Sequence, residues 1–154
     1  MTSRVEIRSD SPERTRQIGE LLGEALTSGD VIVLDRDLGA GKTTFTQGIA
    51  RGMRIEDPVT SPTFVLAREM AGGRTGVGLL HIDAYRIQSL HEWDDLDVDL
   101  QTYATVIEWG ERVADALPAD RLVIRITGEG DARTLWVASS GPRSARLQSA
   151  MTES

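Results

Sequence analysis

A glycine-rich turn over residues 37–44, with the sequence DLGAGKTT, constrains this chain more than any other feature. It directly follows the apolar run VIVL at residues 31–34, which is typical of a buried strand. Where a strand breaks into such a turn and continues as a helix, backbone N–H groups point at one spot and the helix N-terminus adds partial positive charge. The pattern therefore predicts a phosphate-binding loop. An ordinary glycine turn is the alternative, but it leaves the Lys-Thr-Thr run unexplained.

The residue types in the loop predict how it would bind a nucleoside triphosphate with Mg²⁺. Lys42 would reach the β- and γ-phosphates, Thr43 would ligate Mg²⁺, and Thr44 would touch the α-phosphate. The other predicted nucleotide contacts in the loop are Leu38, Gly39, Ala40 and Gly41.

One position departs from the Walker A pattern, which begins with glycine five residues before Gly41. The residue there is Arg36. A long side chain fits at this turn if its φ angle is negative and it points away from the phosphates. The departure bears on nucleotide affinity and hydrolysis rather than on the fold.

Composition excludes several classes of protein. The 154 residues contain no cysteine, so disulfides and thiolate metal sites are excluded, and no apolar run is long enough for a signal peptide or a membrane span. We therefore expect a cytoplasmic protein without membrane contact. With 24 acidic against 17 basic residues, the net charge of −7 argues against charge-driven binding of nucleic acid. Any link to RNA is expected to run through a partner.

Hydrophobic periodicity predicts alternating strands and helices. Ser11 is a predicted N-cap with Pro12 at the first helical position. In chain order the predicted elements are strand 4–8, a helix from 11 to near 29, strand 31–35, helix 43–53, a hairpin of strands 63–69 and 77–83, a short helix opening at 89, strand 104–109, a short helix from 111, and a hairpin of strands 121–127 and 133–138.

This order predicts an α/β fold, a three-layer P-loop NTPase-like domain with a mixed, mostly parallel central sheet and a terminal hairpin. We expect a single domain over residues 1–140 and a polar tail over 141–154, either disordered or a short helix. Within helix 43–53, Gly48 and Gly52 cost about 1 kcal/mol each relative to alanine unless close packing or a helix end explains them.

Two acids follow apolar runs that could end beside the loop. Residues 79–82 lead to Asp83, and residues 104–107 lead to Glu108. If these strands are parallel neighbours of strand 31–35, both carboxylates converge on the terminal-phosphate side of the loop. One acid would hold the metal with Thr43, and the other would orient or deprotonate the attacking water. A solvated strand-end charge or a salt bridge is the alternative for each acid.

A hydroxyl-rich segment, TSPT at residues 60–63, lies where nucleotide-sensing switch segments commonly occur. Thr60 could contact Mg²⁺ or the γ-phosphate, and a capped proline turn is the alternative. Other features are interpreted as structural: an acidic face at Asp95, Asp97 and Asp99 that lacks the glycine and glutamate of a calcium loop, the lone histidines His81 and His91, and the core or partner-facing tryptophans Trp93, Trp109 and Trp136.

Taken together, four motifs resemble those of the TsaE family, small bacterial ATPases required for making threonylcarbamoyladenosine in tRNA. The motifs are DLGAGKTT at 37–44, TSPTF at 60–64, HIDAYR at 81–86, and Glu108-Trp109 with Glu111. The resemblance extends from about residue 11 to about residue 138.

The resemblance implies slow ATP hydrolysis and docking onto the partners TsaD and TsaB, where hydrolysis resets the complex between turnovers and tRNA is met only through the complex. By motif match, Lys42 and Thr43 take the phosphate and Mg²⁺ roles, and Glu108 is an Mg²⁺ or water-positioning acid. Asp83 would lie beside the nucleotide, and the segment around Ser11 and Pro12 would line the adenine side.

Two other functions stay open at this point. Arg36 favours a nucleotide-dependent assembly module that binds ATP or ADP and hardly hydrolyses it. A small-molecule kinase uses the same loop, although no arginine-rich lid segment is visible. The absence of a guanine-reading Asn-Lys-x-Asp motif favours adenine as the base.

Overall fold

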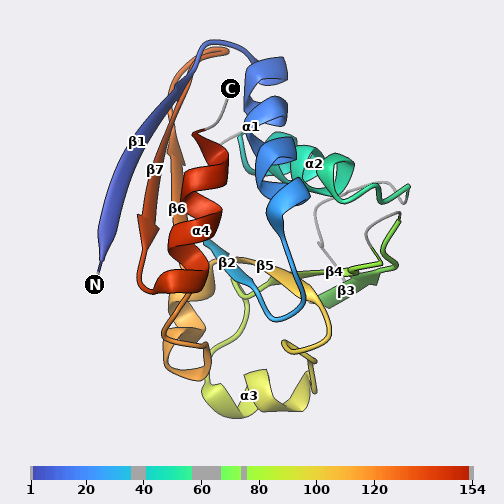
Figure 1. Ribbon diagram of the computed structural model, residues 1–154. Helices are drawn as coiled ribbons and strands as arrows, with labels where there is room; N and C mark the ends of the chain where they lie inside the picture. Colours follow the sequence, from blue (N-terminus) through green and yellow to red (C-terminus); the bar gives the residue numbers. More distant parts are fainter. Residues whose placement is uncertain (1, 36–40, 57–66, 74–75, 153–154) are drawn as a thin grey trace.

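The computed structural model of the chain describes residues 2–35, 41–56, 67–73 and 76–152. These residues form a seven-stranded sheet in the order β1-β7-β6-β2-β5-β4-β3 (Figure 1). The strands are β1 (Ser3–Ser9), β2 (Val31–Leu34), β3 (Ala67–Met70), β4 (Leu79–Asp83), β5 (Ala104–Glu108), β6 (Leu122–Thr127) and β7 (Arg133–Ser139).

The sheet is mixed, as predicted. Strand β2 is parallel to both of its neighbours, β5 and β6, and β4 is parallel to β5. The pairs β1–β7, β6–β7 and β3–β4 are antiparallel. Strands β1, β2, β4, β5 and β6 therefore run in one direction, and the terminal β6–β7 hairpin is confirmed. The other predicted hairpin is confirmed for β3 and β4, while residues 63–66 of its first strand lie outside the described residues.

Helices cover both faces of the sheet. They are α1 (Pro12–Ala25), α2 (Lys42–Gly52), α3 (Leu90–Asp95), the 3₁₀ helix η1 (Gly110–Ala116) and α4 (Pro142–Met151). One core cluster joins the sheet to α1, α2 and α4, with Phe45, Ile49 and Leu147 buried in it. A second cluster, which includes Trp93 of α3 and Val113 of η1, lies on the other face. The domain therefore has the three layers that the sequence predicted.

Helix α1 begins as predicted and ends earlier than expected. The Ser11 hydroxyl caps it by accepting a hydrogen bond from the backbone N–H of Arg14 at 3.1 Å, and Pro12 is its first residue. The helix stops at Ala25 rather than near Gly29, because Leu26 turns to extended backbone. Beyond that point the Asp30 carboxylate accepts from the backbone N–H of Thr27 at 2.8 Å and holds a turn.

Glycines on both helices allow α1 and α2 to pack closely. A Cβ at Gly23 of α1 would lie 2.1 Å from the carbonyl oxygen of Ile49, and one at Gly48 of α2 would lie 2.2 Å from that of Arg16. Gly52, the last residue of α2, is equally tight, at 2.2 Å from the carbonyl oxygen of Glu20. Close packing therefore explains the two glycines that helix propensity disfavours.

We expect the variant Gly23→Ala to lower the free energy of unfolding by about 1–3 kcal/mol, because the added methyl group must push α2 away from α1. The gain in helix propensity, about 1 kcal/mol, acts in the opposite direction. Thermal unfolding measures the effect, and Glu24→Ala, at the exposed neighbouring position, is the matched control. A Gly23→Ala variant as stable as the control would contradict the close packing.

Residues 142–151 of the expected polar tail form helix α4, which buries Ser144, Leu147, Gln148 and Met151. Asp120 holds the start of α4 by accepting hydrogen bonds from the backbone N–H groups of Arg143 and Ser144 at 2.8 and 2.9 Å. Partial burial raises the pKa of the Asp120 carboxyl, but its hydrogen bonds to Ser144 and Arg143 outweigh this and leave the pKa below its usual value. Of the two expected alternatives, disorder and a short helix, the structure shows the helix for residues 142–151.

Two arginines of α4 clamp a buried acid. Asp30, which is fully buried, precedes β2 and receives Arg143 Nη1 at 2.9 Å on one carboxylate oxygen and Arg146 Nη2 at 3.0 Å on the other. Since buried carboxylates require paired charges or hydrogen bonds, this clamp fixes α4 to the start of the strand that leads into the loop.

Candidate functional site

The two predicted acids meet at one edge of the sheet. Asp83 ends β4 and Glu108 ends β5, and the two residues are directly paired in the parallel register. Glu108 is also paired with Leu34, the last residue of β2. The three strands are therefore parallel neighbours, as the sequence predicted, and their carboxyl ends lie together where ligands bind in α/β sheets.

Glu108 faces the layer that contains α2. Side chains alternate along a strand, and Ala104 and Val106 of β5 belong to the core cluster shared with α2. The carboxylate oxygen Oε2 of Glu108 lies 2.7 Å from Nε2 of His81, a buried residue of β4. The histidine that sequence analysis treated as a lone structural residue is thus in contact with a predicted site residue.

Asp83 shares this edge and is partly exposed. Its Oδ1 accepts a hydrogen bond from the backbone N–H of Tyr85 at 2.9 Å, which holds the carboxylate over the turn that follows β4. The Tyr85 ring, 48% exposed, packs edge-on against Trp109 with 4.9 Å between ring centroids.

Lys42 is the first residue of α2 and is only 5% exposed. It is also the only lysine in the sequence. Its Nζ lies 4.9 Å from the centroid of the Trp109 ring, a cation–π arrangement. The predicted phosphate-binding ammonium is thus held beside the residue that follows Glu108.

Trp109 has an unusual backbone. Its φ of 60° and ψ of 31° are in the left-handed region, which costs a non-glycine residue roughly 1–2 kcal/mol. Its N–H donates to the carbonyl oxygen of Leu34 at 3.0 Å, and Gly110 follows at once in η1. Strain of this kind is concentrated at functional sites. Trp109 was expected in the core or on a partner surface, and its position against Lys42 adds it to the candidate site.

Two further acids belong to this region: Glu111 lies near Lys42, and Asp35 lies near Glu111. Partial burial raises the pKa of the Glu111 carboxyl above its usual value, the negative charge of Asp35 raises it further, and the positive charge of Lys42 lowers it. Asp35 directly follows β2, and Glu111 lies on η1. Neither was predicted as a site residue from its chemistry, although Glu111 belongs to one of the motifs that carried the family resemblance.

A small cavity lies beside the N-terminus of α2. It has a volume of about 230 Å³ and is lined by Pro12, Thr15, Gly41, Thr44, Gly130, Asp131 and Arg133. It brings together Pro12, Gly41 and Thr44, three of the predicted nucleotide contacts, whereas the Ser11 hydroxyl is engaged in capping α1. Thr43 is exposed on the first turn of α2.

Four residues that line this cavity were not predicted from the sequence: Thr15, Gly130, Asp131 and Arg133. A Cβ added at Gly41 would lie 3.3 Å from Arg133 Nε and 2.7 Å from Cγ2 of Ile126. The β6–β7 hairpin thus presses directly against the start of α2. Only the pairing of β6 with β2 creates this contact, and no local signal in the sequence reveals it.

Four predicted contacts, Leu38, Gly39, Ala40 and Thr60, lie outside the described residues, as does Arg36. Their roles stay predictions.

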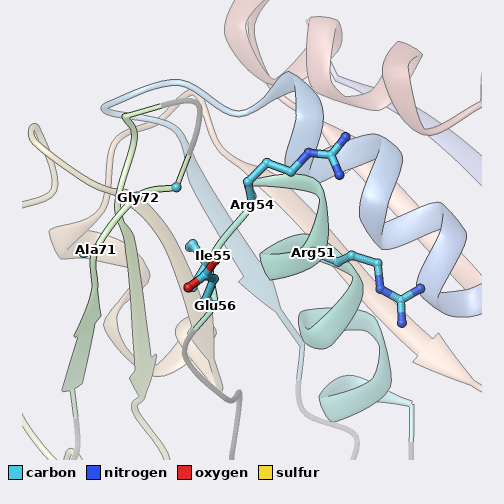
Figure 2. A pocket seen from close by; sticks show the side chains of 7 residues that line it. Arg51, Arg54, Ile55, Glu56, Ala71 and Gly72 are labelled. Carbon is cyan, nitrogen blue, oxygen red and sulfur yellow. The ribbon is translucent and has the colours of Figure 1, made fainter.

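Another pocket lies away from these residues (Figure 2). It has a volume of about 740 Å³ and is lined by Arg51, Arg54, Ile55, Glu56, Ala71, Gly72 and Gly73. Figure 2 shows the Arg51 and Arg54 side chains directed away from the hollow, and Arg51 pairs with Glu13 of α1 at 3.3 Å. None of the predicted contacts lines this pocket.

Within the part of the chain that the structure describes, no group of three or more His, Cys, Asp or Glu side chains is arranged to hold a metal ion. Over the same residues, no helix is both long and apolar enough to span a bilayer.

Known proteins are similar to this chain over most of its length. Residues 9–135 match the family described as "Threonylcarbamoyl adenosine biosynthesis protein TsaE". A Mycobacterium tuberculosis protein named tRNA threonylcarbamoyladenosine biosynthesis protein TsaE is 46% identical over 123 residues, which cover 74% of this chain and 73% of the relative. The protein of the same name from Treponema pallidum is 41% identical over 135 residues, covering 84% and 97%. The crystal structure of Bacillus subtilis YdiB superposes with a TM-score of 0.77 at 31% identity, covering 99% of this chain and 96% of YdiB.

Proposed function

Because the chain belongs to the TsaE family of tRNA threonylcarbamoyladenosine biosynthesis proteins, we propose that it is the Mg²⁺-dependent ATPase of that modification machinery. In this proposal it works in the cytoplasm, binds ATP or ADP, hydrolyses ATP slowly when alone and faster with its partners, and resets the TsaD–TsaB complex between turnovers.

The observation that carries the proposal is the convergence of Lys42, Asp83 and Glu108. Asp83 and Glu108 hold paired positions of β4 and β5 on the face of the sheet that α2 covers, and the single lysine, at the start of α2, lies beside Trp109, the residue after Glu108. Phosphoryl transfer requires cationic groups on the phosphates and an acid that orients the attacking water. Lys42 would hold the terminal phosphates, and Asp83 or Glu108 would accept a hydrogen bond from the water.

The donor set also fits Mg²⁺. Thr43 and Glu108 would hold the ion through a hydroxyl and a carboxylate oxygen, and the ligand and water would complete its six positions. When bound, Mg²⁺ supplies neutralisation of the charge on the phosphates. A site with few protein ligands is what the described residues offer.

The nucleoside would occupy the cavity beside α2. Pro12 and Thr44 line this cavity, and Arg133, which also lines it, would add a cation near the α-phosphate. Main-chain N–H groups at the start of α2 and this guanidinium would share the negative charge.

The acidic composition supports indirect contact with tRNA. A net charge of −7 opposes direct binding to a polyanion, so TsaD and TsaB would contact the tRNA.

Arg36 at the first position of the loop favours a second candidate, a nucleotide-dependent assembly module with little hydrolysis.

Depleting the protein from its host is expected to lower the threonylcarbamoyladenosine content of tRNA, measured by nucleoside analysis. A wild-type copy should restore the modification, and a Lys42→Ala copy should not.

Phosphate release by the purified protein, with and without TsaD and TsaB, separates the two candidates: stimulation by the partners supports the ATPase, and nucleotide binding without release supports the assembly module. Normal tRNA modification after depletion would contradict both.

A further inference from the structure

The contact between His81 and Glu108 is a largely enclosed polar contact at the candidate site. Nε2 of His81 lies 2.7 Å from Oε2 of Glu108, and the two side chains are only 3% and 13% exposed. They come from neighbouring parallel strands and share the face that α2 covers, since His81 is paired with Val106 and Asp83 with Glu108. None of the steps proposed above uses His81.

The direction of this hydrogen bond follows from its surroundings. An ionised carboxylate oxygen only accepts, so Nε2 carries the hydrogen. The other ring nitrogen, Nδ1, is buried and has no hydrogen-bond partner among the residues that the structure describes. A hydrogen there would be a buried donor without an acceptor, which is costly. The ring therefore has its hydrogen on Nε2 and donates to Glu108.

We propose that His81 is a positioning residue for Glu108, an inference that rests on the proposed ATPase function. Glutamate has three side-chain torsions and, at the solvent edge of a sheet, several accessible rotamers. A rigid, buried donor at 2.7 Å selects one of them and keeps the carboxylate at the carboxyl end of β5, turned toward α2. Hydrogen bonds of this kind orient acids that hold metals or water.

The competing explanation reverses the roles: Glu108 merely satisfies a histidine that packs in the core. The two explanations differ in what a substitution does. If His81 only fills space, an apolar side chain of similar size leaves the chemistry intact. If His81 positions Glu108, the position of the donated N–H decides the activity.

Three variants separate these cases. His81→Leu removes the donor, His81→Gln places an amide N–H close to the position of Nε2, and His81→Asn has an amide that reaches only as far as Nδ1. His91→Leu is the matched control, because His91 also lies near a carboxylate, Asp95 at 3.8 Å, with its side chain 87% exposed.

Turnover is measured with the partners present, together with the Mg²⁺ concentration needed for half-maximal ATP binding by calorimetry. We expect His81→Leu to lower kcat about 10- to 100-fold and to raise the Mg²⁺ concentration needed for half-maximal ATP binding by a similar factor. The ATP affinity measured without Mg²⁺ should change little. His81→Gln should recover most of both quantities, whereas His81→Asn should not. Wild-type values in His81→Leu would overturn the proposal, as would a folded His81→Gln protein as defective as His81→Leu.

Side-chain ¹⁵N NMR of the nucleotide-free protein tests the contact even if the ATPase function is wrong. The chain contains two histidines, so two imidazole rings are expected, each with one signal from Nδ1 and one from Nε2. The His81 ring should show hydrogen on Nε2, and Glu108→Gln should shift its signals while those of His91 stay unchanged. A hydrogen on Nδ1, or a His81 signal that Glu108→Gln does not move, would overturn the positioning role. Failure of the wild-type protein to bind ATP would instead reject the proposed function.

Discussion

Replacing Lys42 with alanine is expected to lower ATP turnover by roughly 100- to 1,000-fold, the loss typical when one group that stabilises transition-state charge is removed. Lys42 is the only lysine in the chain, so no second ammonium group can substitute for it. Its position at the start of α2 and its burial against Trp109 place it where phosphate charge would develop. Phosphate release with the partners present measures the effect, and calorimetry measures the accompanying loss of ATP affinity.

The control for this variant is Lys42→Arg, which keeps the charge and changes its shape and reach. We expect it to retain more ATP affinity than Lys42→Ala and to recover little of the turnover. Thermal unfolding should show that Lys42→Ala is folded, since it removes a buried cation rather than an apolar contact. Turnover and ATP affinity at wild-type values in Lys42→Ala would contradict the assignment of the phosphate site.

The double variant Arg143→Ala/Arg146→Ala is expected to lose about 3–5 kcal/mol of stability. Both guanidinium groups bind the fully buried carboxylate of Asp30, and among the residues that the structure describes their removal leaves that charge with only Thr27 as a hydrogen-bond donor. An unpaired charge in the interior costs far more than a surface ion pair. Chemical denaturation measures the free energy of unfolding.

A third substitution makes this test specific. Adding Asp30→Asn to the double variant removes the unpaired charge, so we expect it to recover part of the lost stability. Arg8→Ala, which disrupts an exposed pair with Glu6, is the control and should change the stability by less than about 1 kcal/mol. A double variant no less stable than Arg8→Ala would show that the clamp does not stabilise α4.

The sequence was most informative where local pattern and tertiary structure agree. The apolar run of β2 and the helical spacing of α2 placed the loop between the correct elements. The sequence analysis brought Asp83 and Glu108 together on the condition that β2, β5 and β4 are parallel neighbours, and the structure meets that condition.

What the sequence did not reveal depends on contacts between distant segments. The packing of α4 rests on arginines that bind Asp30 more than 100 residues away, so the sequence of the polar tail left both disorder and a short helix open. The partner of His81 is 27 residues further along the chain, and Trp109 reaches Lys42 only because β5 lies beside β2. Arg133 meets Gly41 through the β6–β2 pairing. Hydrophobic periodicity carries no information about such pairs.

The most direct test of the account is calorimetric titration of the purified protein with ATP and with ADP in the presence of Mg²⁺. We predict that each nucleotide binds at a single site and that Lys42→Ala strongly weakens the binding. Absence of binding by the wild-type protein, both alone and together with TsaD and TsaB, would contradict the central claim that the edge formed by Lys42, Asp83 and Glu108 is a nucleotide site.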